Sequence, residues 1–199
     1  MRSARNAGVA LLLAIVVGSG CGPAVPNITV PVVGVSARRS DAATIVVVQP
    51  TTRYKSVSLV DGSGRLLGQL HERSHTVLRV PPGPVRLYAF WENRFKAGDR
   101  LEGSVLAGKV YYATVGYRGT VGGIALLALN PRSPDGRWAE RDRYLSKTPS
   151  VQMDPKRAPE VMKYLGAAPP ELFRWADEHT DGLKGRDHDE RVIRPEDGI

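Results

Sequence analysis

The chain of 199 residues contains a single cysteine, Cys21. One cysteine cannot form an internal disulfide, so the sequence excludes the small secreted domains that disulfides hold together. The fold must instead rest on a hydrophobic core. The length is sufficient for one domain with a core of its own and short for two.

Hydrophobic runs long enough to cross a membrane are also missing. The residues 7–17 form an uncharged run of eleven residues, which as a helix would be about 16 Å long against a hydrocarbon core of about 30 Å. Arg2 and Arg5 precede this run, and the small residues 18–20 (GSG) follow it. This order is typical of a secretory signal peptide, so we expect residues 1–20 to be one.

The familiar signatures of catalysis are missing as well. The sequence has no Gly-x-Ser-x-Gly elbow and no metalloprotease helix. The glycine-rich residues 61–68 (DGSGRLLG) precede a predicted strand and lack the Lys-Ser/Thr pair of a phosphate loop, so we interpret them as a hairpin turn. We therefore expect no catalytic residue and no cofactor, and we predict that the protein is not an enzyme.

Histidines and carboxylates do not form a convincing metal motif. In an extended chain His71 and His75 lie roughly 13 Å apart, too far to bind one ion unless a turn brings them together, and we expect them in a connection between strands. A second group lies in the charged tail, where we expect solvated side chains and no metal site. This group consists of His179, Asp181, Asp187, His188 and Asp189.

The charge is moderately basic, with 28 Lys and Arg against 20 Asp and Glu and a formal net charge of +8. No stretch concentrates basic residues with interleaved aromatics, so we do not expect nucleic acid as a partner. The charge indicates either a solvated surface or a face toward anionic lipid or wall polymer.

Cys21 stands directly after residues 18–20, an order that resembles the processing site of bacterial lipoproteins. In that family the cysteine thiol is alkylated by diacylglycerol, and cleavage then leaves the cysteine as the first residue. The resemblance implies lipid attachment at Cys21, although Gly18 stands where the family prefers Leu. Gly22 in place of Asp favours the outer membrane by the sorting habit of enteric bacteria. The alternative is an ordinary signal peptide cleaved near Gly20.

Strand signals fill residues 42–130, after a proline- and glycine-bearing stretch at residues 21–41 that we interpret as a tether. Within that stretch, residues 30–35 are either part of the tether or an edge strand. The absence of a long helix between the strand signals predicts a mainly β domain, either an antiparallel sandwich or a barrel. Of the two we expect an antiparallel β-sandwich of about seven or eight strands. The predicted strands are 42–48, 54–60, 65–70, 76–80, 85–91, 101–106, 110–117 and 124–129.

Helix signals follow in residues 131–180, which we expect to form a short helical extension that packs on the sandwich. Residues 138–145 can form one helix, and residues 154–165 a second, with Asp154 as its cap. A third opens at Pro169, where Leu172, Trp175 and Ala176 share one face. Residues 181–199 are charged and contain glycine, and we expect them to be disordered.

Three motifs recur in one known family: residues 68–70 (GQL), 80–87 (VPPGPVRL) and 107–112 (AGKVYY). Their order is similar to that in a family of small bacterial lipoprotein domains of unknown function. The resemblance covers about residues 42–129 and implies a transthyretin-like or carboxypeptidase-regulatory-like β-sandwich. Since that family has no established catalytic residues, the resemblance assigns none here.

Aromatic side chains supply the candidate binding surface. They could form a sugar-binding surface, or they could provide core and cross-strand packing, which we favour. We therefore expect a lipid-anchored envelope protein that binds or scaffolds envelope proteins or cell-wall polymer. The alternatives are a hydrolase of wall glycan or peptide, or an accessory domain of one, and a purely structural lipoprotein. The aromatic candidates are Trp91, Tyr111, Tyr112, Tyr117 and Trp138.

Overall fold

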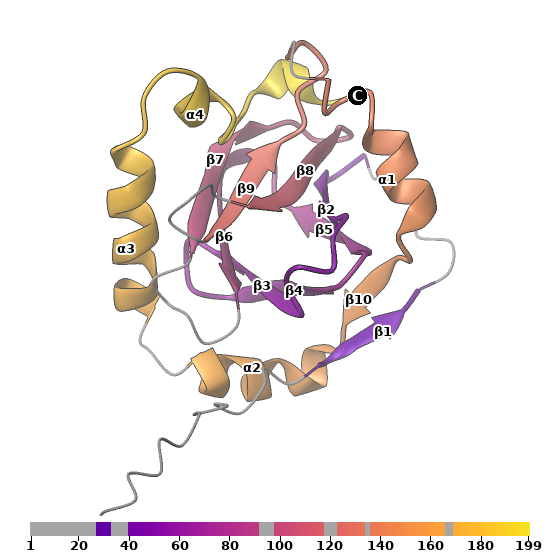
Figure 1. Ribbon diagram of the computed structural model, residues 1–199, viewed down its shortest axis with the longest axis vertical. Helices are drawn as coiled ribbons and strands as arrows, with labels where there is room; N and C mark the ends of the chain where they lie inside the picture. The colour runs from indigo at the N-terminus through magenta and orange to yellow at the C-terminus, as the bar shows by residue number, and fades with distance from the viewer. Residues whose placement is uncertain (1–26, 33–39, 92–97, 118–122, 134–135, 166–168) are drawn as a thin grey trace, which may run out of the picture.

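Eight strands form at the eight predicted segments. The computed structural model describes residues 27–32, 40–91, 98–117, 123–133, 136–165 and 169–199 (Figure 1). The strands are β2 (Ala43–Gln49), β3 (Ser56–Asp61), β4 (Leu66–His71), β5 (Ser74–Val80), β6 (Gly83–Trp91), β7 (Asp99–Val105), β8 (Val110–Tyr117) and β9 (Ile124–Ala128).

These strands build two facing sheets, which confirms the predicted mainly β sandwich. One sheet has the order β11-β7-β6-β3-β4, where β11 is Val192–Ile193, and the other has the order β5-β2-β8-β9. Most neighbours are antiparallel, but β2 pairs with β8 in parallel, and so does β11 with β7. These two parallel pairs are exceptions within the predicted antiparallel sandwich. Alternation shows which face of a strand is buried, but it carries no information on the partner strand.

The main core lies between the sheets. It includes Ile45 and Val47 of β2, Leu59 of β3 and Leu126 of β9, each of which is completely buried. All seven residues of β2 are buried, as is typical of a β-branched strand that is covered on both faces. The outer face of β2 is covered because Val46 and Val48 join a second cluster with Tyr144 and Leu145 of the helical extension.

Helices cover the outer faces of both sheets (Figure 1). α1 packs on the four-stranded sheet, while α2 and α3 pack on the five-stranded sheet, where Val161, Leu165 and Ala176 meet Tyr88 and Phe90. None of the described helices is long and apolar enough to span a membrane. The helical segments are α1 (Arg141–Lys147), η2 (Pro155–Arg157), α2 (Ala158–Leu165), α3 (Pro169–Asp181), α4 (Arg186–Asp189) and η3 (Pro195–Asp197).

Capping follows the sequence prediction at one of these helices. The Asp154 side chain accepts a hydrogen bond from Lys156 N at 2.9 Å, so it caps the turn that leads into α2. In α3, Ala176 is buried and Trp175 is half-buried, whereas the side chain of Leu172 lies outside the described residues. Phe173, which the sequence analysis did not single out, stacks on Tyr88 with ring centroids 4.2 Å apart.

The predicted tether at residues 21–41 was too long. A short strand, β1 (Thr29–Pro31), pairs antiparallel with β10 (Val151–Met153), and Ile28 is buried against the helices. The open question about an edge strand is therefore answered for Thr29–Pro31, which belong to the folded body. The reason is that Ile28 fills a site between the five-stranded sheet and the helices α2 and α3.

Residues 181–199 are ordered, so the prediction of a disordered tail was wrong. The α4 helix leads into β11, and Ile199 exchanges two backbone hydrogen bonds with Val110. Arg191 Nε lies 2.8 Å from Asp99 Oδ2 in a pair that is almost completely buried. Composition predicts disorder here because the tail is polar. The carboxylate that pairs with Arg191 belongs to Asp99 on β7, about 90 residues earlier in the chain.

Candidate binding surface

Three of the predicted aromatic residues do not form a common surface. Tyr111 is buried in the core, and its hydroxyl accepts from Leu106 N and donates to Pro195 O. Trp91 is half-buried and packs edge-on against a core tyrosine. Tyr117 is exposed, and the Arg53 guanidinium lies 3.5 Å from the centre of its ring.

The other two predicted aromatics do meet. The rings of Tyr112 and Trp138 lie 5.7 Å apart in an edge-to-face arrangement, and the Arg141 guanidinium covers both, 5.1 Å and 4.2 Å from their centres. Trp138 precedes α1 and Tyr112 lies on the outer face of β8, beside the cluster that α1 covers. This contact therefore fastens the segment before α1 to the sheet.

Cys21, the predicted lipid attachment residue, lies outside the described residues.

A groove with arginine at its rim opens at the end of the sandwich beside the turn at residues 81–83. One hollow of about 590 Å³ adjoins another of about 350 Å³, and both are lined by Gly62, Pro84, Val85 and Arg86. We call the two together the Arg86 groove. Its remaining lining residues are Ile45, Asp61, Ser63, Arg65, Leu67, Val80, Pro81, Leu87, Glu102, Gly103, His188 and Val192.

Strand lengths explain why the groove exists. The last residue of β3, Asp61, pairs with Leu87 of β6, whereas β6 begins four residues earlier at Gly83. Over that excess length β6 pairs with β7 on one side, and on the other Gly62 N donates to Arg86 O. Val85, which lies on this excess length of β6 and is partly buried against the core, lines both hollows.

Hydrogen bonds hold the turn at one wall of the groove. Asp61 Oδ1 accepts from Ser63 N at 2.9 Å and from Arg65 N at 3.0 Å, and Asp61 Oδ2 accepts from Arg65 Nε at 3.0 Å. Burial alone would raise the pKa of Asp61, but these hydrogen bonds outweigh it and lower the pKa. The carboxylate therefore stays ionised and keeps the Arg65 guanidinium at the rim.

Two guanidinium groups remain accessible in the groove. The side chain of Arg65 is 67% exposed and that of Arg86 is 53% exposed. Arg86 has only a long contact with Glu102, 3.7 Å between nitrogen and oxygen, and Glu102 also lies 3.2 Å from Arg100. Because Arg100 shares this carboxylate, much of the positive charge of Arg86 is uncompensated and available to an anionic ligand.

Three carboxylates gather around Arg100, whose side chain is 5% exposed. Its guanidinium lies 2.7 Å from Asp177, 2.7 Å from Asp181 and 3.2 Å from Glu102. The Tyr88 hydroxyl donates to Asp177 at 2.8 Å; burial and this hydrogen bond raise the pKa of Tyr88 to about 12. Each carboxylate already contacts the guanidinium, so this cluster fastens α3 to β6 and β7.

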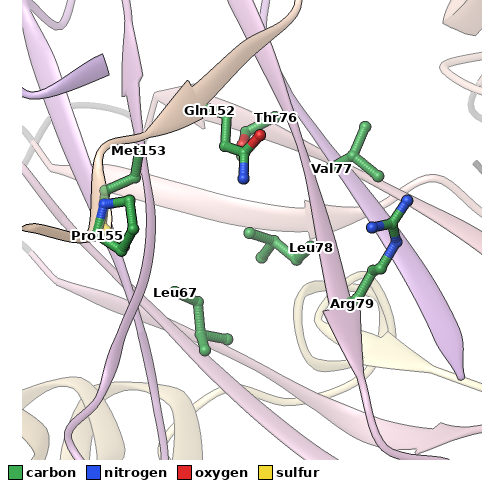
Figure 2. A pocket seen from close by; sticks show the side chains of 8 residues that line it. All are labelled: Leu67, Thr76, Val77, Leu78, Arg79, Gln152, Met153 and Pro155. Carbon is green, nitrogen blue, oxygen red and sulfur yellow. The ribbon is translucent and has the colours of Figure 1, made fainter. Parts of the chain in front are cut away.

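A further hollow, of about 290 Å³, lies where β10 passes the edges of β4 and β5 (Figure 2). Leu67 and Leu78 are among its apolar lining residues, and Figure 2 shows the Gln152 side chain directed toward Leu78. His75 N, nearby on β5, donates to Pro149 O at 3.0 Å, which ties the start of β10 to this edge. We interpret this hollow as the seam between β10 and the sandwich.

Histidines and carboxylates form no group of three that could hold a metal ion within the described part of the chain. His71 ends β4 and His75 lies in β5, with a tight turn between them. His71 Nδ1 contacts Lys55 O and His75 Nδ1 contacts Thr148 Oγ1, both at 2.9 Å. Each imidazole therefore has a partner of its own within the fold.

The groove arginines were missed as candidates by sequence reasoning. Arg86 lies in a predicted strand, where a solvated arginine is common and does not by itself indicate a binding site. The available signal was the combination of two turns, residues 61–64 and 81–83, with an arginine after each.

A scan of the chain against models of known protein families gives no match, and neither does a search of the curated proteins.

Proposed function

We propose that the protein is a lipid-anchored binding module of the bacterial cell envelope. Cys21 is its attachment residue, and the Arg86 groove binds a carboxylate-bearing segment of another envelope component. The groove is the observation that carries this proposal. It is an open, partly apolar hollow with half-exposed guanidinium groups at its rim.

The shape and the chemistry of the groove support a chain-like ligand. Two adjoining hollows share four lining residues, so a ligand can extend from one to the other across Arg86. Guanidinium groups bind carboxylates through two parallel hydrogen bonds, while apolar side chains such as Val85 contact the remainder of a ligand. A segment of wall peptide or of an acidic envelope protein has this chemistry.

The anchor is tested by labelling with a radioactive or clickable fatty acid. Wild-type protein should incorporate the label and Cys21→Ala should not. Gly18→Leu restores the residue that the lipoprotein family prefers, and we expect it to be labelled at least as strongly as wild type. Equal labelling of wild type and Cys21→Ala would overturn the anchor.

The groove is tested by photo-cross-linking in intact envelopes. A photoreactive amino acid at Pro84, which is exposed in the groove, should give adducts that a soluble poly-glutamate peptide competes away. Arg86→Ala should weaken adduct formation about tenfold or more, since a hydrogen bond to a charged group contributes about 1.5–3 kcal/mol. The matched probe at the exposed Leu106 should give no such adducts. Adducts that persist in Arg86→Glu would exclude this binding mode.

A further inference from the structure

Few residues separate Cys21 from the folded body. The Ile28 N–H donates to Gln69 Oε1 at 3.0 Å, and its carbonyl accepts from Asp154 N at 2.8 Å. Asn27 O accepts from the Arg157 guanidinium at 3.0 Å. The chain is therefore fixed to the folded body at Asn27 and Ile28, next to η2.

This short connection limits the orientation of the domain relative to a membrane. Six residue steps lead from Cys21 to Asn27, and a fully extended chain covers at most about 3.6 Å per residue, so the two Cα atoms lie within about 22 Å. A domain of this size is about 40 Å across. An anchor at Cys21 thus keeps the η2 side near the membrane and the opposite side away from it.

Figure 1 shows which parts of the fold these two sides are. The α2 helix lies at one end of the long axis, and the end of the chain marked C lies toward the other. The β7–β8 turn belongs to that second end, because Val110 exchanges backbone hydrogen bonds with Ile199. The α4 helix, which brings His188 to the Arg86 groove, also lies far from α2 (Figure 1).

The segment that faces the anchor has two different sides. Val161 and Leu165 of α2 are completely buried against the sheet. Lys156, Glu160 and Lys163 are exposed, and their spacing of i, i+4 and i+7 places them on the side opposite the buried pair. The outward side of η2 and α2 therefore presents charged residues.

Positive charge is in excess on this outward side. Glu160 accepts two hydrogen bonds from Arg157, at 2.9 Å and 2.7 Å, so these two charges compensate each other. Within the described part of the chain, Lys156 and Lys163 have no ion-pair partner. We call the exposed surface around these two residues the lysine face.

We propose that the lysine face docks on anionic lipid headgroups of the membrane that holds the anchor. This inference rests on the proposed function, because the lipid at Cys21 is what brings the face to the bilayer. The short connection to Cys21 determines that the η2 side of the domain faces the membrane. The two uncompensated lysines attract this side to an anionic surface. In this orientation the part of the Arg86 groove beside α4, which His188 lines, lies away from the membrane.

The test uses the lipidated protein reconstituted in vesicles. Because Cys21 is the only cysteine and carries the lipid, a cysteine introduced at the exposed Pro159 is the only free thiol for a fluorophore. In phosphatidylcholine vesicles containing phosphatidylglycerol, a quencher attached to lipid headgroups should quench this fluorophore. A fluorophore at Leu106→Cys, in the β7–β8 region, should remain unquenched.

Charge variants test the electrostatic part. Each lysine should change the ratio of docked to undocked protein about fivefold, so Lys156→Gln with Lys163→Gln should lower it about 25-fold. The matched control, Lys109→Gln with Lys147→Gln, removes two exposed lysines elsewhere and should leave the ratio unchanged. Added salt should weaken the docking because it screens exposed charges.

Failure of the anchor and failure of the docking give different results. Protein that does not float with the vesicles would overturn both the anchor and the docking. Protein that floats but shows equal quenching at Pro159→Cys and Leu106→Cys would overturn the lysine face alone. The same would follow from unchanged quenching in vesicles of pure phosphatidylcholine.

Discussion

The buried pair of Asp99 and Arg191 offers the sharpest test of the tertiary structure. Arg191 Nε contacts both carboxylate oxygens of Asp99, at 2.8 Å and 3.1 Å. Asp99 is completely buried on β7, and its Oδ2 also accepts from Leu126 N on β9 at 2.8 Å. The pair thus joins the tail to both sheets.

Arg191→Met keeps most of the side-chain volume but leaves the Asp99 carboxylate buried without its cation. Breaking a buried pair in this way costs about 3–5 kcal/mol, a large part of the roughly 5–15 kcal/mol that stabilises a typical domain. The free energy of unfolding, measured by urea denaturation at pH 7, should fall by that amount. Hydrogen exchange should quicken at Leu126 and in residues 190–193.

A double variant separates the buried charge from lost packing. Asp99→Asn with Arg191→Met removes both charges, so it should be more stable than Arg191→Met alone. The exposed pair of Arg174 and Glu178, 3.9 Å apart, is the matched control, and Arg174→Ala should cost less than about 1 kcal/mol. A loss below about 1 kcal/mol for Arg191→Met would refute the buried pair.

Three further changes test other parts of the fold. Gly103→Ala should displace β11 and quicken hydrogen exchange at Ile193, because the new Cβ would lie 1.9 Å from Ile193 O at a φ of +147°. Gly108→Ala is the control, since φ is also positive there but a Cβ would meet no atom within 4 Å. It should leave hydrogen exchange at Ile193 unchanged. Burial lowers the pKa of His75, so its contribution to stability is complete above about pH 6.5 and is lost as the pH falls through the folded pKa. The free energy of unfolding of His75→Gln should therefore depend less steeply on pH below about 6.5, and an unchanged slope would contradict this. Asp154→Ala removes the cap before α2 and should cost about 1 kcal/mol in urea denaturation, and no loss would argue against the cap.

Local patterns were sufficient to predict the strands and the turns between them. The predicted strand at residues 42–48 forms as β2, and the residues 61–64 form the predicted hairpin turn between β3 and β4. These predictions succeed because the burial of alternate side chains and the conformations of Gly and Asp act within a few residues. The Asp154 cap was predictable for the same reason.

Long-range partners were not predictable in this way. Disorder was predicted for residues 181–199 because charged residues are seldom buried in a core. Arg191 is nevertheless buried, because it pairs with the carboxylate of Asp99 on β7. The groove has the same origin: Arg86 and Arg65 are ordinary surface arginines in the sequence. They line one groove because β6 extends four residues, from Gly83 to Arg86, beyond its pairing with the last residue of β3.

By itself, the sequence determined the mainly β class, the positions of eight strands, and the expectation that Cys21 carries a lipid. Each follows from interactions between near neighbours in the chain or from a contiguous motif. Only the tertiary structure decided the parallel pair of β2 with β8, the burial of Asp99 with Arg191, and the meeting of Arg65 with Arg86. These depend on which strands become neighbours, and that choice is set by packing of the whole core, which no local pattern encodes.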